Sequence, residues 1–250
     1  MAGHNKWSKI KHRKAVVDKR RGKVWTKCSK AIIVAAKNGG PDPSSNLALR
    51  YAIDEARYAN MPRDTIERAI QKGAGGGSGE NYEPVRYEGY GPGGVAIIVD
   101  ALTDNRTRTV GDLRLAFGDH GGNLGNAGSV GYMFQAKGRI LVNAPAASED
   151  RMMELAIEAG ADDCIKPEEP AEEPWTILCA VSAFQTVKEA IEKAGQSVPK
   201  GETFAIAEAE IAMVPNDVVE VTGENAETLT ELMDAIEDLD DVQKVYTNAG

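Results

Sequence analysis

Lysine and arginine side chains crowd the first 30 residues, and the chemistry they offer is the binding of phosphate groups. This stretch holds eleven Lys or Arg and one acidic residue, in a chain whose net charge is −9. Clustered cations neutralise phosphates and release condensed counterions, whatever the base sequence of the nucleic acid. We therefore predict a nucleic-acid-binding surface formed by Lys6, Trp7, Lys9, Lys11, His12, Arg13, Lys14, Lys19, Arg20, Arg21 and Lys23.

Charge is divided sharply along the chain. Residues 1–72 contain 17 basic and 6 acidic residues, whereas residues 73–250 contain 12 basic and 32 acidic residues. The acidic part would repel a polyanion, so nucleic-acid contact should be confined to one face near the N-terminus. Two alternatives remain open for the basic cluster: a solvated surface, or a site that docks an acidic protein partner.

Aromatic residues lie among these cations and could stack on bases. Trp25 falls on the apolar stripe of a helical pattern and is predicted to be core, while both roles stay open for Trp7. His4 and His12 have no third ligand nearby, so we interpret His12 as a structural or phosphate-contacting residue and predict no metal site.

A second, smaller group of cations follows a predicted strand in LTDNRTRT at 102–109. Asp104 or Asn105 can cap the helix that starts there, because both side chains accept hydrogen bonds from free backbone amides. Arg106 and Arg108 could then bind an anion at the positive end of that helix. We predict them as a weaker second nucleic-acid site.

No pattern in the sequence supports catalysis or a bound cofactor. The Gly clusters at 89–94 and 120–131 lack the Lys and Ser or Thr of a phosphate-binding loop, and the first suits a hairpin turn. The three Cys residues are scattered, and no nucleophile–base set can be assembled. We predict a non-enzymatic protein without a cofactor or small-molecule substrate, although a hydrolase or a nucleotide-dependent enzyme would be the rival from another class.

Membrane insertion is not expected either. No run approaches the roughly 20 apolar residues that cross a bilayer, and the N-terminus is charged where a secretory signal needs an apolar centre. We expect a cytoplasmic protein.

The periodicity of apolar residues predicts an α+β architecture in three domains. Residues 1–73 should form a basic three-helix bundle, with a possible helix break near Gly22 and a second helix capped by Ser44 and Ser45. The Gly-rich stretch 74–80 is typical of a linker. Residues 81–135 and 215–250 should form one discontinuous α+β domain, with strands near 128–134 and 218–222, and residues 136–214 an inserted ferredoxin-like β-α-β-β-α-β domain.

Several long strings closely resemble the YebC family, which includes the mitochondrial translational activator of cytochrome c oxidase. They are GHNKWSKIKHRK at 3–14, GGPDP at 39–43, NMPRDTIERAIQKG at 60–73, YEGYGPGGVAIIV at 87–99, LTDNRTRT at 102–109, HGGNLGNAGSVGYMF at 120–134 and LDDVQKVY at 239–246. The resemblance runs through nearly the whole chain, and CIKPEEPAEEPW at 164–175 departs from it most.

That resemblance implies a helical N-terminal domain and two α+β domains, one inserted into the other. It also implies one of two non-enzymatic functions. Members are commonly described as DNA-binding transcriptional regulators, whereas others look like RNA-binding, ribosome-associated translation factors that relieve stalling at consecutive prolines. The phosphates of DNA and of ribosomal RNA attract the same cations, so the charge pattern leaves this choice open.

Overall fold

The computed structural model describes residues 17–75, 81–169, 171–197 and 203–250, with side chains from residue 22 onward. The chain forms two compact units. Unit 1 combines the residues up to 135 with Pro215–Gly250, and unit 2 is Ala136–Val214. The fold is α+β, as predicted, with an N-terminal helical segment followed by two four-stranded sheets. The division into three domains stays a prediction.

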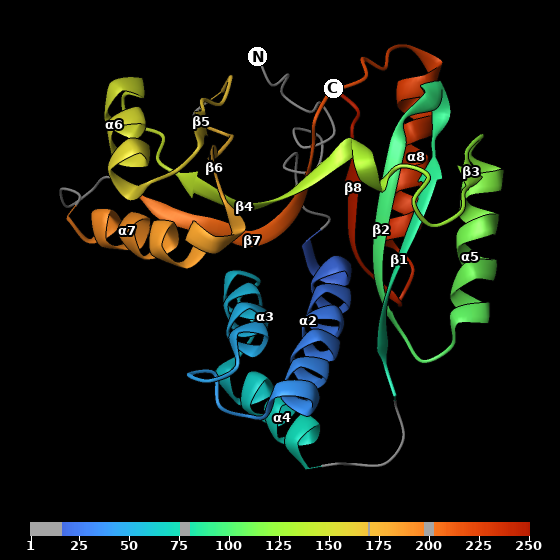
Figure 1. Cartoon of the computed structure of the whole chain (residues 1–250), viewed down its shortest axis with the longest axis horizontal. Coiled ribbons are helices and arrows are strands. Elements are labelled where there is room, and N and C mark those ends of the chain that lie inside the picture. The colour runs from blue at the N-terminus through green and yellow to red at the C-terminus, as the bar shows by residue number, and fades with distance from the viewer. Residues whose placement is uncertain (1–16, 76–80, 170, 198–202) are drawn as a thin grey trace. The chain divides into compact units, whose positions relative to one another are not determined.

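The described residues of the N-terminal segment form helices (Figure 1). These helices are α2 (Val17–Gly39), α3 (Leu47–Tyr58) and α4 (Arg63–Ala74). The sequence left open one helix or two helices broken near Gly22, and the structure has one, since α2 continues through Gly22. Apolar residues recur on one side of each helix and pack into a common core. The buried residues of this core are Cys28, Ile32, Ala36, Leu49, Ala52, Ile53, Ala56, Met61, Ile66 and Ala69.

The turn between α2 and α3 depends on Asn46, which the sequence interpretation overlooked in favour of Ser44 and Ser45. Asn46 Oδ1 caps α3 by accepting from the backbone N–H of Leu49 at 3.0 Å. Its Nδ2 donates to the carbonyl oxygens of Ala35 and Gly40, both at 2.8 Å. One buried amide thus satisfies the end of one helix and the start of the next.

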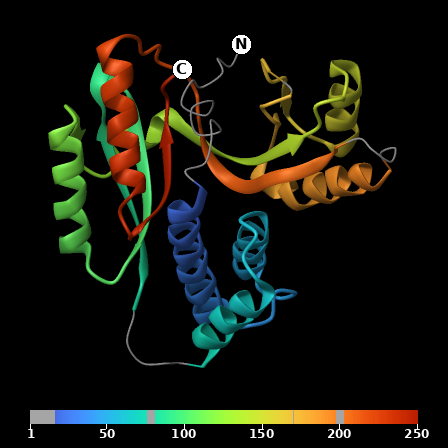
Figure 2. The same ribbon diagram turned by 180° about the vertical axis from the view of Figure 1, so that it is seen from behind.

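The first sheet has the strand order β3-β1-β2-β8, and α5 and α8 cover one of its faces (Figure 2). Its elements are β1 (Glu83–Tyr90), β2 (Ala96–Thr103), α5 (Arg106–Asp119), β3 (Asn123–Leu124), α8 (Glu224–Glu237) and β8 (Val242–Thr247). Alternate residues of β2, Ile97 and Val99, point into the core with Phe117 of α5 and Leu232 of α8.

The connections of this sheet agree only partly with the sequence prediction. The Gly cluster at 89–94 forms the predicted hairpin between β1 and β2, with positive φ angles at Gly93 and Gly94. The predicted strand near 128–134 was wrong: a loop and a short 3-10 helix, η2 (Gly131–Met133), occupy most of that range. The predicted strand at 218–222 is reduced to one bridge between Val219 and Ala249.

Unit 2 contains the second sheet, in the order β5-β6-β4-β7. Its elements are β4 (Phe134–Asn143), α6 (Glu149–Ala159), β5 (Asp163–Ile165), β6 (Trp175–Cys179), η3 (Val181–Ala183), α7 (Phe184–Gln196) and β7 (Ala205–Pro215). The sequence β-α-β-β-α-β and this strand order are those of a ferredoxin-like layer. At Gly138 of β4 an added Cβ would lie 2.6 Å from Cys179 Sγ and 3.0 Å from Phe184 Cβ, so helix α7 packs closely on the sheet there.

Candidate nucleic-acid interface

Helix α2 carries the C-terminal part of the predicted interface. Positions 19–21 lie on its backbone, and Lys23 is the first predicted residue whose side chain is described. The other predicted N-terminal residues lie outside the described residues: Lys6, Trp7, Lys9, Lys11, His12, Arg13 and Lys14. The structure therefore describes the backbone of one helix of the predicted interface, and both the interface and the contacts of those residues stay a prediction.

Lys23 and Lys27 lie one turn apart on α2 and both contact the C-terminal end of α8. Lys23 Nζ lies 2.9 Å from Asp238 Oδ2 and donates to the Asp238 carbonyl oxygen at 3.2 Å. Lys27 Nζ donates to the Glu237 carbonyl oxygen at 2.7 Å. The last carbonyl groups of a helix lack partners within the helix and carry partial negative charge, so these ammonium groups stabilise the end of α8.

Lys30, a further turn along α2, joins a buried polar cluster. Its Nζ donates to the Asp240 carbonyl oxygen at 2.9 Å and lies 3.3 Å from Asp241 Oδ1. Asp241 Oδ2 accepts from Arg108 at 2.7 Å and from Thr109 Oγ1 at 2.9 Å. Burial acts to raise the pKa of Asp241, but the hydrogen bonds outweigh it, so this pKa lies below its usual value.

Arg106 and Arg108 lie at the N-terminus of α5, and Asn105 Oδ1 caps that helix by accepting from the Arg108 N–H at 3.1 Å. Both guanidinium groups are bound by carboxylates of the chain. Arg106 pairs with Glu83 through two nitrogens, and Arg108 Nη2 donates to Asp104 Oδ1 at 2.8 Å. Hydrogen bonding from Arg106 lowers the pKa of Glu83. An external anion would have to displace these carboxylates, and the second site stays a prediction.

The Gly-rich loop at 121–131 surrounds a buried carboxylate of β1. Glu88 accepts backbone N–H groups of Gly128 at 2.9 Å and of Val130 and Gly131 at 2.7 Å. Burial acts to raise the pKa of Glu88, yet these amides more than compensate and lower it. Three amides that could have bound a phosphate are therefore used by the chain itself, which agrees with the absence of a phosphate-loop pattern.

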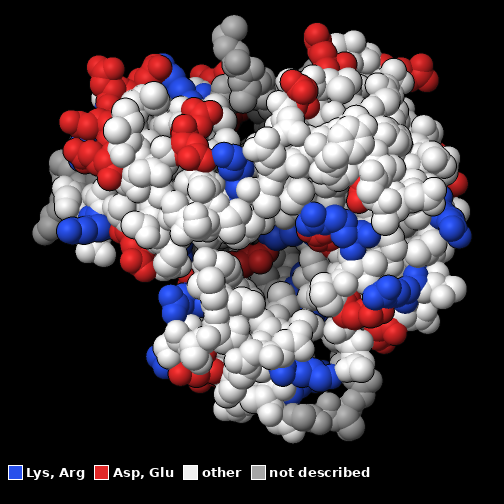
Figure 3. Space-filling model, in the orientation of Figure 1, with Lys and Arg blue, Asp and Glu red and all other residues white. Residues whose placement is uncertain are grey.

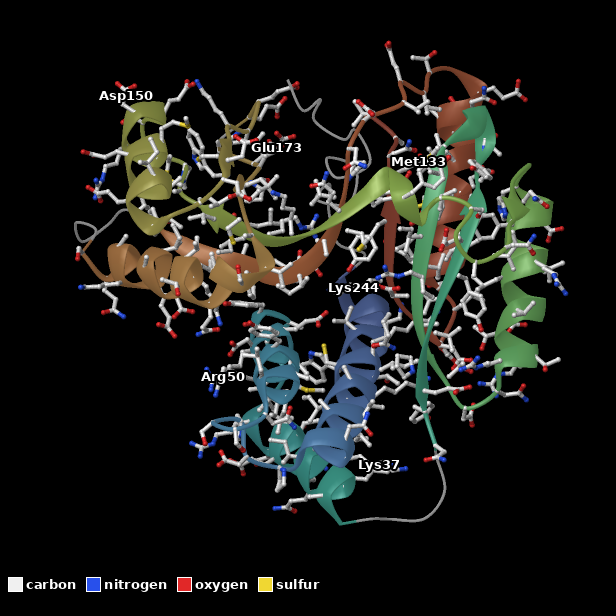
Figure 4. All side chains as sticks on the ribbon, viewed as in Figure 1. Lys37, Arg50, Met133, Asp150, Glu173 and Lys244 are labelled. Carbon is white, nitrogen blue, oxygen red and sulfur yellow. The ribbon has the colours of Figure 1, made fainter. Side chains whose placement is uncertain are left out.

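Trp25 packs against the core of the helical segment, as predicted, and its Nε1 donates to the Ala59 carbonyl oxygen at 3.0 Å. Lys244 of β8 is labelled in Figure 4. Its Nζ lies 2.5 Å from Oε1 of Glu55 in α3. Burial, with the nearby Glu55 carboxylate adding to it, raises the pKa of Cys28 to about 12, so this thiol is unreactive at neutral pH. The Lys244–Glu55 ion pair thus joins α3 to a strand of the first sheet.

Within the described ranges, no group of His, Cys, Asp and Glu side chains could hold a metal ion. Among those same residues, no helix is long and apolar enough to span a bilayer. The surface in Figure 3 shows carboxylates gathered over part of unit 2. Helix α6 contributes exposed Glu149, Asp150, Glu154 and Glu158 to that unit, and an excess of carboxylates on this helix repels phosphates.

Sequence reasoning missed two buried carboxylates: Asp241, which binds Lys30 and Arg108, and Glu88, which binds backbone amides. Asp241 looked like part of an acidic amphipathic segment, and Glu88 like an ordinary strand residue. A partial signal was present, because Lys23, Lys27 and Lys30 recur at helical spacing on a stripe that is neither apolar nor fully exposed. Nothing in the sequence indicated which segment would contact that stripe, since α2 and α8 are separated by about 200 residues.

Comparison with known protein families gives two matches. Residues 5–76 match the model described as the TACO1/YebC protein N-terminal domain. Residues 82–249 match the model described as the TACO1/YebC second and third domain. Together these matches span most of the chain.

Similar proteins occur in several bacteria. The chain is 53% identical to a "probable transcriptional regulatory protein" of Burkholderia multivorans, over all of this chain and 98% of that protein. It is 52% identical, with the same coverage, to a protein of Cupriavidus pinatubonensis with the same description. A crystal structure of a conserved hypothetical protein from Aquifex aeolicus has a TM-score of 0.85 and 46% identity, and the alignment covers 98% of this chain and 96% of that one.

Proposed function

Because the chain belongs to the TACO1/YebC family, we propose that it is a non-enzymatic, nucleic-acid-binding regulator of gene expression, and specifically a DNA-binding transcriptional regulator. The observation that carries this proposal is the segregation of charge, with 17 basic and 6 acidic residues before residue 73. Its relatives are described as regulatory proteins, which supports the non-enzymatic assignment.

Phosphate contact is the proposed role of the N-terminal cations. Helix α2 begins at Val17 and continues for 23 residues, so its first turns can present cations along a duplex or a folded RNA. The residues assigned to this role are Lys6, Lys9, Lys11, His12, Arg13, Lys14, Lys19, Arg20, Arg21 and Lys23, with Trp7 as a stacking residue and Arg106 and Arg108 as a weaker second site.

The two sheet layers would act as the acidic body that limits binding to one face. Residues 73–250 contain 32 acidic and 12 basic residues, and a polyanion is repelled wherever carboxylates are in excess. A partner could be recruited through the same body. Neither role requires a cofactor or a small-molecule substrate.

A titration of purified protein with a short labelled DNA duplex and a short RNA hairpin tests the proposal. Reversal of Lys11, Arg13 and Lys14 to Glu should abolish binding, because it removes three cations and adds three anions at the proposed phosphate contacts. A matched control reverses Arg63, Arg68 and Lys72 to Glu on α4, which makes the same change in net charge. If both triple variants lose affinity equally, net charge controls binding and the proposed site is wrong.

Ribosomal RNA is the alternative target, because its phosphates offer the same charge. Sucrose-gradient sedimentation of a lysate that expresses this chain separates the two functions. Co-migration with ribosomes, lost in the Lys11, Arg13 and Lys14 variant and weakened by salt, would favour a translation factor. Absence from ribosomal fractions, together with salt-sensitive binding of duplex DNA, would favour a transcriptional regulator.

A further inference from the structure

The C-terminal end of α8 presents to α2 the same chemistry that a nucleic-acid backbone would present. Its contacts with Lys23 and Lys27 include a carboxylate oxygen of Asp238 and the carbonyl oxygens of Glu237 and Asp238. These are closely spaced oxygen acceptors with full or partial negative charge, as phosphate oxygens are. Two cations in line with the proposed binding surface are thus occupied from within the chain.

We propose that Lys23 and Lys27 belong to the nucleic-acid-binding surface, and that the C-terminal end of α8 occupies them until a polyanion displaces it. This inference rests on the proposed function and adds to it a competitor within the chain. Lys27, which the sequence interpretation did not assign, becomes a phosphate-contacting residue. The contact with α8 becomes an autoinhibitory one.

Helical geometry connects this pair to the proposed site. Position 19 precedes Lys23 by four residues, so it lies one turn away on the same face of α2, and Lys27 lies one turn beyond. At about 1.5 Å per residue, positions 19 to 27 span roughly 12 Å along the helix axis. A phosphate backbone that follows this face reaches the end of α8 directly.

The contacts at Lys23 are weak enough to be exchanged. The side chains of Lys23 and Asp238 are 38% and 68% exposed, and water and salt screen such a pair strongly. A polyanion that replaces Asp238 offers several phosphates at once and gains counterion release. Competition at this position should therefore favour the nucleic acid.

Lys30 should keep its contacts with Asp240 and Asp241 while the end of α8 is displaced from Lys23 and Lys27. Its side chain is 13% exposed and that of its partner Asp241 is 8% exposed. Asp241 is also held by Arg108 and Thr109, so removal of Lys30 would take one cation away from a carboxylate that the rest of the cluster keeps buried. The exchange is consequently limited to Lys23 and Lys27, whose contacts are with the C-terminal end of α8.

Zero-length cross-linking with a carbodiimide, read by mass spectrometry, tests this directly. Lys23 Nζ and Asp238 Oδ2 are 2.9 Å apart, so the free full-length protein should give an amide cross-link between them. The pair Lys166 and Glu149 in unit 2, 2.8 Å apart and similarly exposed, is the internal control. A DNA duplex without terminal phosphates should suppress the first cross-link severalfold and leave the second unchanged.

A matched pair of variants measures the competition. Asp238→Asn removes the competing carboxylate, whereas Glu231→Gln makes the same change in charge at an exposed position earlier in α8. Relative to Glu231→Gln, Asp238→Asn should bind the duplex about two- to fivefold more tightly, the range expected for loss of an exposed ion pair.

The outcomes separate the two proposals. Fluorescence anisotropy in the same samples reports binding, and absence of any binding would overturn the proposed function and this inference with it. Binding with an undiminished Lys23–Asp238 cross-link, or equal affinities of the two variants, would overturn the inference alone. Failure of the cross-link to form in the free protein would show that the contact does not exist in solution.

Discussion

Two buried carboxylates organise the polar structure of unit 1. Glu88 is 7% exposed and is bound by backbone amides of the Gly-rich loop. Asp241 is 6% exposed and is bound by cations and hydroxyl groups from α2, β2 and α5. A buried ionised group is tolerated only where such partners replace its hydration. The stability of each carboxylate therefore depends on the correct placement of the segments that bind it.

At the residue scale, Glu88→Gln should destabilise the protein by about 1–3 kcal/mol, because the amide side chain directs N–H groups at backbone donors. Urea unfolding measures the difference. The pH dependence has a definite sign. Folding lowers the pKa of Glu88 from 4.5. The ionised carboxylate therefore contributes fully to the free energy of unfolding above pH 4.5, and this contribution is lost as the pH falls through the lower pKa of the folded state.

Glu231→Gln is the control for this substitution, since Glu231 is exposed and should tolerate the change within about 0.5 kcal/mol. The gap in stability between wild type and Glu88→Gln should narrow as the pH is lowered below about 4.5. If the stability difference between wild type and Glu88→Gln stays constant down to acid denaturation, Glu88 does not bind the loop amides as an ionised carboxylate.

Asp241→Asn should cost about 2–3 kcal/mol, because Arg108 and Lys30 lose an anionic partner that is itself buried. Asp240→Asn makes the same change in charge at the neighbouring exposed side chain, whose backbone carbonyl alone contacts Lys30. Thermal or urea unfolding of the two variants should differ clearly. Equal stability would mean that the Asp241 cluster contributes no more than an exposed carboxylate.

At the scale of elements, one side chain couples two helices of the N-terminal segment. Asn46→Ala should destabilise the segment by about 2–3 kcal/mol, because a cap is lost and two carbonyl groups lose their donor. Asn46→Asp keeps the cap and should recover part of the loss. Circular dichroism during urea unfolding follows the helices directly.

Ser45→Ala provides the comparison, since Ser45 is exposed and bonds only within its own turn. We expect the free energy of unfolding of Ser45→Ala to be within about 0.5 kcal/mol of that of wild type. If Ser45→Ala is the more damaging change, the cap of α3 has been assigned to the wrong residue.

How far the sequence predicts the fold differs between local and distant features. The helices of the N-terminal segment, the hairpin at 89–94 and the order of elements in unit 2 follow from local periodicity and turn residues, and all were predicted. The strand predicted near 128–134 failed because a distant residue, Glu88, binds the backbone amides of that loop. Propensity within a short window contains no information about such a partner.

In the candidate site, too, local features can be predicted from the sequence and distant contacts cannot. Its cations and their helical spacing can be found in the sequence, whereas their partners at the end of α8 cannot, because about 200 residues separate them. The ion pairs of Arg106 with Glu83 and of Arg108 with Asp241 likewise arise from tertiary packing. Charge density predicts where a polyanion could bind, and only the fold shows which cations are already engaged.

At the scale of the whole molecule, the central claim is that a basic N-terminal segment binds nucleic acid while an acidic body does not. The described portion of the chain is consistent with that division, since its carboxylates engage most of the described cations of α2 and α5. Affinity should therefore depend on the first residues of the chain and should fall steeply with salt.

The salt dependence of binding tests this claim most directly. We would titrate wild-type protein and the variant with Lys11, Arg13 and Lys14 changed to Glu onto the same duplex over a series of salt concentrations. For wild type, log K should fall linearly with log salt, by about 0.9 for each phosphate contacted, and the variant should lose both affinity and slope. Equal affinity and an equal slope in the two proteins would contradict the account.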